Sequence, residues 1–306
     1  MLAHKTMTIA GVSTRRRAIV SGTTALIVSP FVVRAGFAQR PAVNIGVIQP
    51  LSGANAQSGI NCRNGIELVA DAINAAGGIK AVGGAKMNLI VADATSNPTT
   101  ASTVAQRLIT QNELTAVLGA YVSSLTLPIS EVTARADIPF LTMSTADEIT
   151  GRGLESVFQV VAKGSVTGKA QIDYTLAIAN AAGSKIEKIA IMYENSAFGV
   201  AQSRGLRRAA KDANIEVAMD EPYPLGIADA TPLIDKLRAS GAEAAFPLSY
   251  LNDSLFIIRT MRRQRITIPV IGGGPATSFP TSRRVWASLQ RMCFRSRLQT
   301  TISHPR

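Results

Sequence analysis

The sequence contains little cysteine and little histidine, and each shortage removes a class of function. Cys62 and Cys293 are the only cysteines among 306 residues, too few for a disulfide framework and without the spacing of metal ligands. The two histidines, His4 and His304, lie near the ends of the chain, so its central part has no histidine base or metal ligand. We therefore expect no metal site and no hydrolase built on a Ser/His or Cys/His pair.

Two signatures of nucleotide chemistry are also missing. No Gly-x-Gly-x-x-Gly turn follows the first predicted strand, and no phosphate-binding Gly-Lys-Ser/Thr loop occurs. Aromatic residues make up only 5% of the chain, while aliphatic residues supply most of its hydrophobicity, as in layers of helices and parallel strands. These features predict an α/β protein that is not an enzyme and uses no cofactor.

The formal net charge of +12 is concentrated at the two ends of the chain. Residues 1–38 hold five basic residues and no acid, and residues 281–306 hold six arginines and no acid. Subtracting these 11 charges from 12 leaves +1 for residues 39–280. Because the body is nearly neutral, the charge does not indicate a nucleic-acid partner.

Residues 1–38 have the three parts of an export signal. Basic residues at 13–17 precede an apolar run at 18–33, and small residues at 36–38 end the segment. Polar residues and Pro30 interrupt the run, which makes it weak for a membrane-spanning helix. Arg15-Arg16 resembles a twin-arginine signal, but ordinary secretory export stays open because Ala18 replaces a bulky apolar residue. We predict export with cleavage after Ala38, without a lipoprotein cysteine.

From residue 43 the chain alternates short apolar runs with amphipathic stretches, the pattern of βαβ units and parallel sheets. We predict an N-terminal α/β domain at 39–160 and a second at 161–272, each doubly wound, followed by a crossover and an atypical basic tail at 273–306. In such sheets the ligand site lies beyond the carboxyl ends of the strands. The strand-to-helix turns are therefore the places to search.

The tail from Thr281 onward loses this rhythm and consists largely of arginine, serine and threonine with scattered apolar residues. A basic tail of this kind can bind anionic partners. A shifted reading frame, in which the segment is not native coding sequence, explains the change of composition better. We favour this second interpretation.

Several turns carry specific motifs. Residues 48–53 read Ile-Gln-Pro-Leu-Ser-Gly, and Gln57-Ser58-Gly59 and the run at 64–79, which covers the end of a helix predicted at 58–75, follow at fixed spacing. Later turns contain Tyr121-Val122-Ser123-Ser124, Ser144-Thr145 and residues 193–199. Together they resemble the periplasmic solute-binding family of the leucine/isoleucine/valine-binding type over roughly residues 43–280. The resemblance implies a type I periplasmic binding fold, with two Rossmann-like domains, a hinge and a ligand cleft between the domains.

The resemblance also implies a receptor that captures a small polar solute and delivers it to the membrane permease of an ABC-type amino acid uptake system in the periplasm. Its implied ligand-binding positions are Ser58, Ser123, Ser124, Ser144, Thr145, Phe198 and Tyr250. Ser123, Ser124 and Thr145 are short donors near strand ends, and a helix starting at Ser124 would direct its free N–H groups at an anion.

Each of these positions has an ordinary structural alternative. Ser123 or Ser124 can cap a helix, and Thr145 can stabilise a turn. Phe198 and Tyr250 can be core packing rather than covers for a ligand. Ser58 stands where the family can have an aromatic residue, so its small side chain would leave room or admit water.

The chain departs from the family pattern in two ways. Some amino-acid binders have an acidic residue after the strand equivalent to 269–272, whereas this chain has Gly272-Gly273-Gly274-Pro275. The ligand can therefore be an amino acid, another carboxylate or an amide. A sensor for carboxylates or amides is an alternative function to uptake. The basic tail also stands where complete family members return to the first domain with further helices and strands. The first domain is therefore predicted to be incomplete, and a truncated, non-binding remnant is an alternative to a receptor.

Overall fold

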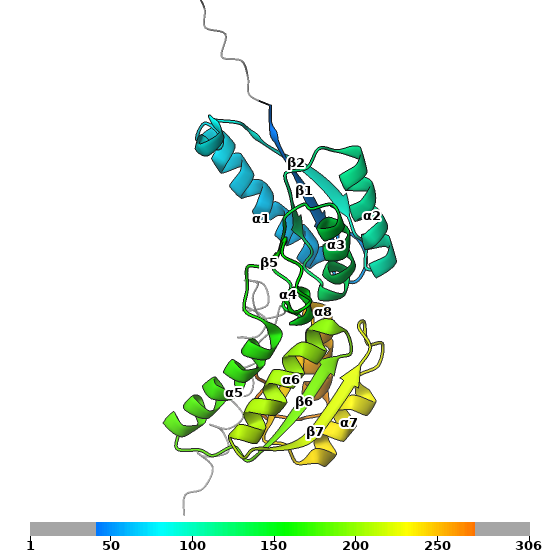
Figure 1. Ribbon diagram of the computed structural model, residues 1–306. Helices are drawn as coiled ribbons and strands as arrows, with labels where there is room; N and C mark the ends of the chain where they lie inside the picture. The colour runs from blue at the N-terminus through cyan, green and yellow to red at the C-terminus, as the bar shows by residue number, and fades with distance from the viewer. Residues whose placement is uncertain (1–40, 273–306) are drawn as a thin grey trace, which may run out of the picture. The chain divides into compact units, whose positions relative to one another are not determined.

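The computed structural model describes residues 41–272, which form two parallel β-sheets with helices on both faces of each (Figure 1). The predicted export signal at 1–38, the cleavage point after Ala38, and the crossover and tail at 273–306 lie outside the described residues. No helix within residues 41–272 has both the length and the apolar character needed to cross a membrane. The α/β class expected from the sequence is confirmed.

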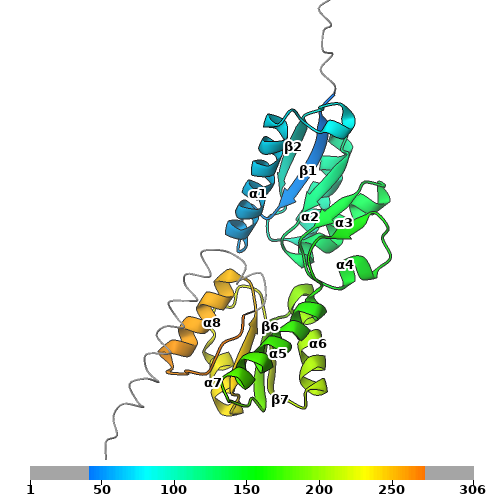
Figure 2. The same ribbon diagram turned by 90° about the vertical axis from the view of Figure 1, so that its left-hand side faces the viewer.

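The first sheet has the strand order β2-β1-β3-β4-β5, and all neighbouring strands are parallel. Its strands are β1 (Val43–Gln49), β2 (Met87–Asp93), β3 (Ala116–Gly119), β4 (Phe140–Thr142) and β5 (Val157–Gln159). Its helices are α1 (Ala56–Ala75), the short η1 (Lys80–Val82), α2 (Pro98–Gln111), α3 (Ser123–Arg135) and α4 (Glu148–Gly151). Helix α1 covers one face, and α2 and α3 cover the other (Figures 1 and 2).

The second sheet has the order β7-β6-β8, again with parallel neighbours. It consists of β6 (Lys188–Glu194), β7 (Glu216–Tyr223) and β8 (Ala244–Leu248), and its helices are α5 (Gly164–Ala181), α6 (Ala197–Asp212), α7 (Thr231–Ser240) and α8 (Leu251–Arg263). The predicted strand at 269–272 forms only a parallel bridge between Val270 and Ala245. Two backbone hydrogen bonds fix this bridge, so the segment extends the sheet beyond β8 by one pair.

Alternation along β6 divides the second sheet between two cores. Ile189 and Ile191 pack with residues of α5 and α6, whereas Ala190 and Met192 pack with residues of α7 and α8. All four side chains are completely buried. Successive side chains of a strand point to opposite faces, so this central strand reads as a continuous apolar run.

Helices α5 and α6 approach each other at two glycines. A Cβ atom on Gly205 would lie 2.0 Å from the carbonyl oxygen of Ser165, and one on Gly168 would lie 2.2 Å from that of Gln202. Beside them, the Gln202 amide donates a 2.7 Å hydrogen bond to the side chain of Gln171. The close approach of the two backbones therefore depends on the missing side chains.

Strand β7 lies at an edge of the second sheet and contains an irregularity in its pairing. Ile189 pairs with Val217 and Ala190 pairs with Met219, so Ala218 is left as an extra residue in β7. This is a β-bulge, which bends the strand and increases its local twist.

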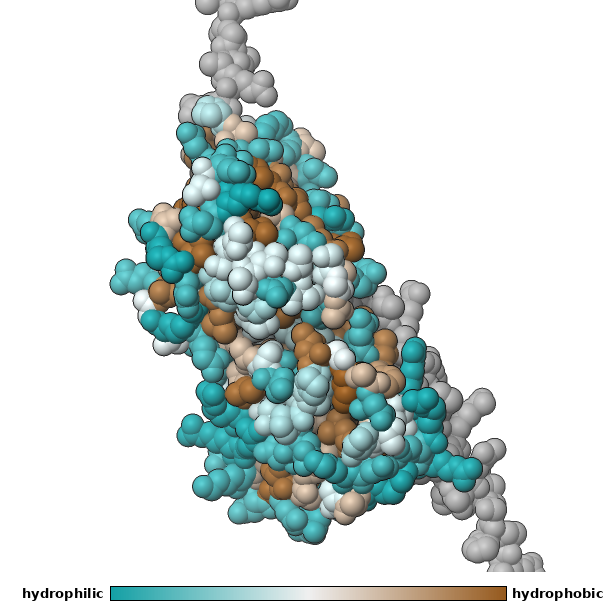
Figure 3. Space-filling view, turned by 90° about the vertical axis from the view of Figure 1, so that its right-hand side faces the viewer, coloured by the Kyte–Doolittle hydropathy of each residue, from teal (hydrophilic) through white to brown (hydrophobic). Residues whose placement is uncertain are grey.

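The surface that bears α2 and α7 is mostly hydrophilic, and apolar side chains show there in narrow groups (Figure 3). Larger exposed apolar side chains occur elsewhere: Leu68 and Val69 on α1, and Tyr174 and Ile178 on α5. Tyr174 is 70% exposed and Leu68 is 72% exposed. Single exposed apolar residues are common on proteins, and nothing in the described residues covers these.

Candidate functional site

The candidate site lies where the carboxyl ends of β1, β3 and β4 meet residues at the start of α6 and α8. Gln49, the last residue of β1, is buried, and its Oε1 accepts a 3.0 Å hydrogen bond from the backbone N–H of Tyr121. Its Nε2 has no hydrogen-bond partner among the described residues. This glutamine connects the turns after β1 and β3, and it leaves a buried donor unused.

Ser123 and Ser124 form the first turn of α3. The helix starts at Ser123 after Val122, and no side chain caps it, so the structure does not support the capping alternative for either serine. The Ser123 hydroxyl is buried and accepts a 3.3 Å hydrogen bond from the backbone N–H of Ala146. Ser124 is half-buried. The first N–H groups of a helix have no intrahelical partner, so this turn suits an anion.

Ser144 and Thr145 follow β4 but have different surroundings. The Ser144 hydroxyl shares a 2.6 Å hydrogen bond with Thr126 and donates to the carbonyl oxygen of Ala120, so it links β4 to the start of α3. Thr145 Oγ1 is buried and has no hydrogen-bond partner in the described part of the chain. Of the two hydroxyls, that of Thr145 is therefore the one available to a solute.

Gln159 of β5 supports the loop that carries Thr145. Its side-chain amide donates to the backbone oxygens of Ser144 at 2.9 Å and Ala146 at 3.0 Å. The carbonyl oxygen of Thr145 accepts a 2.6 Å hydrogen bond from the N–H of Gly164. These contacts hold the loop backbone on both sides of Thr145 while leaving its hydroxyl unpaired.

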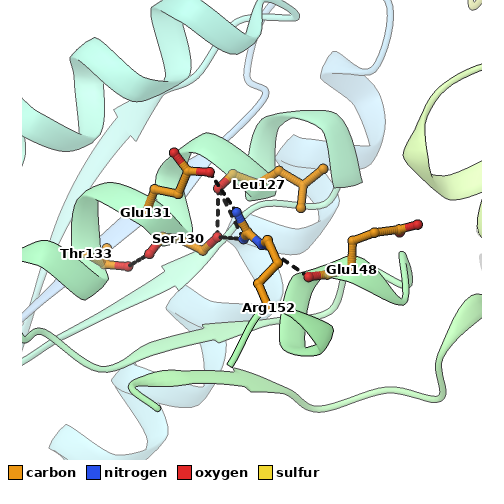
Figure 4. Close-up of polar contacts among 6 residues, drawn as sticks. All are labelled: Leu127, Ser130, Glu131, Thr133, Glu148 and Arg152. Atoms are coloured by element: carbon orange, nitrogen blue, oxygen red, sulfur yellow. Dashed lines mark hydrogen bonds and ion pairs between the residues drawn. The ribbon is translucent and has the colours of Figure 1, made fainter. Parts of the chain in front are cut away.

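Arg152 anchors the far end of the same segment to α3 (Figure 4). Its guanidinium forms a 2.8 Å ion pair with Glu131 and donates to the hydroxyl of Ser130 at 2.5 Å. It also donates to the carbonyl oxygen of Glu148 at 3.1 Å, which closes the last turn of α4. Arg152 thereby fixes α4, and with it the loop after β4, against the first sheet's helix layer.

Three aromatic rings from both sheets' surroundings pack together: Tyr121 after β3, Phe198 on α6 and Tyr250 before α8. The Tyr250 ring lies 5.1 Å from that of Phe198 and 5.7 Å from that of Tyr121, measured between centroids. All three residues are buried and belong to the core cluster of the first sheet. The packing alternative for Phe198 and Tyr250 is thus realised in this structure, although packing does not prevent contact with a solute.

The Tyr250 hydroxyl is the polar end of this aromatic cluster. It lies near the amide and hydroxyl of Ser123 but forms no well-aligned hydrogen bond with the described residues. Burial raises its pKa well above the ordinary value, and the charge of Glu194 adds to that effect. It is therefore a neutral donor directed at the start of α3.

Ser58 lies on α1 and is 4% exposed. Its hydroxyl lies beside that of Tyr121, where hydrogen bonding opposes the rise that burial causes in the tyrosine pKa. The structure therefore places Ser58 next to Tyr121 of the aromatic cluster.

Two buried carboxylates escaped the sequence analysis. Glu194, at the end of β6, accepts from the N–H and hydroxyl of Ser196 and from the N–H of Gly199, at 2.7 to 2.9 Å. Asp253, in the first turn of α8, accepts a 3.0 Å hydrogen bond from the N–H of Gly226. Burial raises the pKa of both carboxyls. The spacing of Glu194 and Ser196 before a helix was a usable signal for the first.

The sequence of this chain is similar to those of known binding proteins. Residues 42–279 match the family model described as "Periplasmic binding protein". A Leu/Ile/Val-binding protein homolog 8 from Brucella abortus is 35% identical over 249 residues, which cover 79% of this chain and 61% of the relative. This chain thus spans about three fifths of the length of that curated relative.

Two solved structures have similar folds. A branched-chain amino acid transporter substrate-binding protein from Streptococcus pneumoniae, in complex with isoleucine, has a TM-score of 0.67 at 24% identity, covering 76% of this chain and 64% of that one. A solute-binding protein of an ABC transporter from Rhodopseudomonas palustris, in complex with 3,4-dihydroxybenzoic acid, also has a TM-score of 0.67, at 19% identity, covering 76% and 61%. At these identities the likeness concerns the fold.

Within residues 41–272, no three His, Cys, Asp or Glu side chains lie close enough together to hold a metal ion.

Proposed function

The chain belongs to the periplasmic binding protein family, and we propose that it is the solute-binding receptor of an ABC-type uptake system. Its solute is a small polar molecule, and an amino acid is the first candidate because relatives are named for leucine, isoleucine and valine. One structural neighbour is bound to 3,4-dihydroxybenzoic acid, so other carboxylates belong to the same proposal. The receptor is exported and acts in the periplasm, where it delivers the solute to a membrane permease without chemical change.

One observation carries this proposal: the buried hydroxyl of Thr145 has no hydrogen-bond partner among the described residues. A buried polar group without a partner is costly, and natural structures rarely keep one without a reason. The loop backbone around Thr145 is held by Gln159 and Gly164, so the residue that carries this hydroxyl is kept in place. A bound solute would supply the missing acceptor or donor.

The start of α3 supplies the complementary group. The N–H groups of Ser123 and Ser124 belong to its first turn, where the helix dipole also favours a negative charge. The hydroxyl of Tyr250 lies close to the Ser123 amide. A carboxylate at this point would accept from backbone amides, from Tyr250 and from Thr145. We therefore propose that the solute's carboxylate, or an amide oxygen, binds here.

The experiment is a binding screen on the full chain. L-isoleucine, L-leucine, 3,4-dihydroxybenzoate and acetamide are each titrated while the midpoint of thermal unfolding and the heat of binding are recorded. A compound that binds only the folded state raises the midpoint by mass action. We expect one chemical class to do so, and Thr145→Val to weaken that class about 3- to 10-fold, the value of roughly one hydrogen bond.

Thr103→Val provides the matched control. It makes the same chemical change at an exposed position on α2, where the hydroxyl only donates back to the carbonyl oxygen of Thr99. Binding should be unchanged in this variant. A panel in which no compound shifts the wild-type midpoint would contradict the receptor function and favour a non-binding remnant.

A further inference from the structure

A hollow lined in part by Tyr250 adjoins the aromatic cluster and includes Ala54 and Asn55 of the turn after β1. Its volume is about 240 Å³, and Leu225, Ile227 and Phe256 supply apolar lining. Its polar lining includes Asn55 and Asp253. The side-chain amide of Asn252 donates a 3.0 Å hydrogen bond to the carbonyl oxygen of Ala54, which ties the start of α8 to the turn after β1 beside the hollow.

Asp253 is 5% exposed, and only part of its hydrogen-bonding capacity is used. Its Oδ2 accepts the hydrogen bond from Gly226, whereas Oδ1 forms none with the described residues. Glu194 offers a contrast, because both of its oxygens are bound by the turn that starts α6. Of these two buried carboxylates, Asp253 is therefore the one with an oxygen left for a ligand.

Asn55 provides a second, independent indication. It is 6% exposed, lines the same hollow, and its Nδ2 has no hydrogen-bond partner among residues 41–272. The hollow thus contains an unused acceptor on Asp253 and an unused donor on Asn55. A molecule that fills it would offer a hydrogen-bond donor to the first and an oxygen to the second.

The charge of the hollow selects between ligands. None of its lining residues is basic, and Glu194 is close enough for the charge of Asp253 to raise its pKa in addition to the effect of burial. A negative, poorly solvated site of this kind repels anions and favours a positively charged donor. A primary ammonium group is compact and carries three N–H donors, which suits a carboxylate with one free oxygen.

We propose that Asp253 binds an ammonium group of the solute, while Asn55 binds an oxygen of the same molecule. The inference rests on the proposed receptor function and names the residues that would select an amino acid over a simple carboxylate or amide. It assigns the positive end of the solute to α8, whereas residues 272–274 are all glycine and carry no charge. The apolar lining would contact the solute's side chain.

The test uses three probes that differ by one group each. L-Leucine carries both charges, 4-methylpentanoate lacks the ammonium, and 3-methylbutan-1-amine lacks the carboxylate. Each is titrated by calorimetry into the full wild-type chain and into Asp253→Asn, which keeps the shape and can still accept from Gly226. Asp212→Asn, at the exposed last residue of α6, which forms no ion pair with the described residues, makes the same charge change as a control.

We expect leucine to bind the wild type 10- to 100-fold more tightly than 4-methylpentanoate, the range for hydrogen bonds to charged groups. This preference should vanish in Asp253→Asn and persist in Asp212→Asn. Equal wild-type affinity for leucine and 4-methylpentanoate would overturn the inference and leave the receptor function standing, and this comparison requires no variant.

The amine separates the remaining outcomes. If 3-methylbutan-1-amine binds the wild type and loses affinity in Asp253→Asn while leucine does not bind, the ammonium site is supported but the selection of an amino acid is overturned. If the affinity for neither leucine nor 3-methylbutan-1-amine falls in Asp253→Asn, the inference is wrong.

Discussion

The rings of Tyr121 and Tyr250 lie 5.7 Å apart with an interplanar angle of 55°. Tyr121 belongs to the turn after β3, and Tyr250 immediately precedes α8. Tilted aromatic pairs at this distance attract each other beyond the burial of their area, by roughly 0.5 to 1.5 kcal/mol. The contact therefore joins a turn of the first sheet to a helix of the second, and Tyr250 is the residue through which stability and binding should be most closely connected.

Replacement of Tyr250 should separate its ring from its hydroxyl. Tyr250→Phe keeps the ring and removes a buried hydroxyl that has no well-formed hydrogen bond, so we expect the free energy of unfolding to stay within about 1 kcal/mol of wild type. Tyr250→Ala removes a ring that is 2% exposed and should cost about 3 to 5 kcal/mol. Urea unfolding measures both. A large loss in the phenylalanine variant would mean that the hydroxyl is bonded in solution.

Two threonines with buried hydroxyls, Thr126 and Thr145, should respond differently to the same substitution. The Thr126 hydroxyl lies within hydrogen-bonding distance of the carbonyl oxygens of Ala120 and Val122 and of the Ser144 hydroxyl, so Thr126→Val should lower the free energy of unfolding by about 1 to 3 kcal/mol. Thr145→Val removes a hydroxyl that has no hydrogen-bond partner among the described residues and should leave the free energy of unfolding nearly unchanged. The two urea midpoints, compared side by side, test the assignment. Equal losses would contradict it.

The contact between α5 and α6 should not tolerate a methyl group at Gly205. Gly205→Ala places Cβ against the backbone oxygen of Ser165 and should cost about 1 to 3 kcal/mol through overpacking. Gly65→Ala is the control, because a Cβ there meets no atom within 4 Å in an exposed part of α1. That variant should gain up to about 1 kcal/mol from helix propensity. Thermal unfolding of both variants measures the difference in sign.

Cys62 should be chemically inert while the protein is folded. Its thiol is buried beside the sulfur of Met143 at 3.3 Å, and burial raises its pKa to about 11. Because the folded pKa lies above the ordinary one, this group's contribution to stability is complete below the ordinary thiol pKa and is lost as the pH rises toward 11. Alkylation by iodoacetamide at pH 8, followed in a Cys293→Ser variant, should begin only on addition of denaturant. Rapid labelling of the native protein would disprove the burial.

Much of the fold could be predicted because local pattern and tertiary structure agree. The apolar run that became β8 and the amphipathic stretches that became α7 and α8 match the observed bounds, since strand and helix periods were unambiguous there. Helix α4 was missed because its four residues are too short to show a period. The apolar run at 157–161 predicts a strand of five residues, but β5 ends at Gln159 and Val160 is exposed, so hydrophobicity alone overestimates its length.

The candidate site was less accessible to sequence reasoning. The motifs pointed to Ser123 and Thr145, but only coordinates reveal that Ser144 already spends its hydroxyl on Ala120 and Thr126 while Thr145 does not. Asp253 was overlooked because a single aspartate in the first turn of a helix normally reads as a favourable charge for the helix dipole. Its burial and its neighbour Asn55, which lies 198 residues earlier in the chain, have no local signature.

The bulge at Ala218 has a consequence for how the molecule behaves at high concentration. An exposed edge strand offers unpaired N–H and C=O groups that can recruit a strand of another molecule. In β7 the extra residue interrupts the regular spacing of those groups, and Asp220 and Glu221 add negative charge along the same edge, paired in part with Arg207 and Lys236. A foreign strand would have to match an irregular register and bury charged side chains. This edge is therefore protected against intermolecular β-pairing by its own geometry.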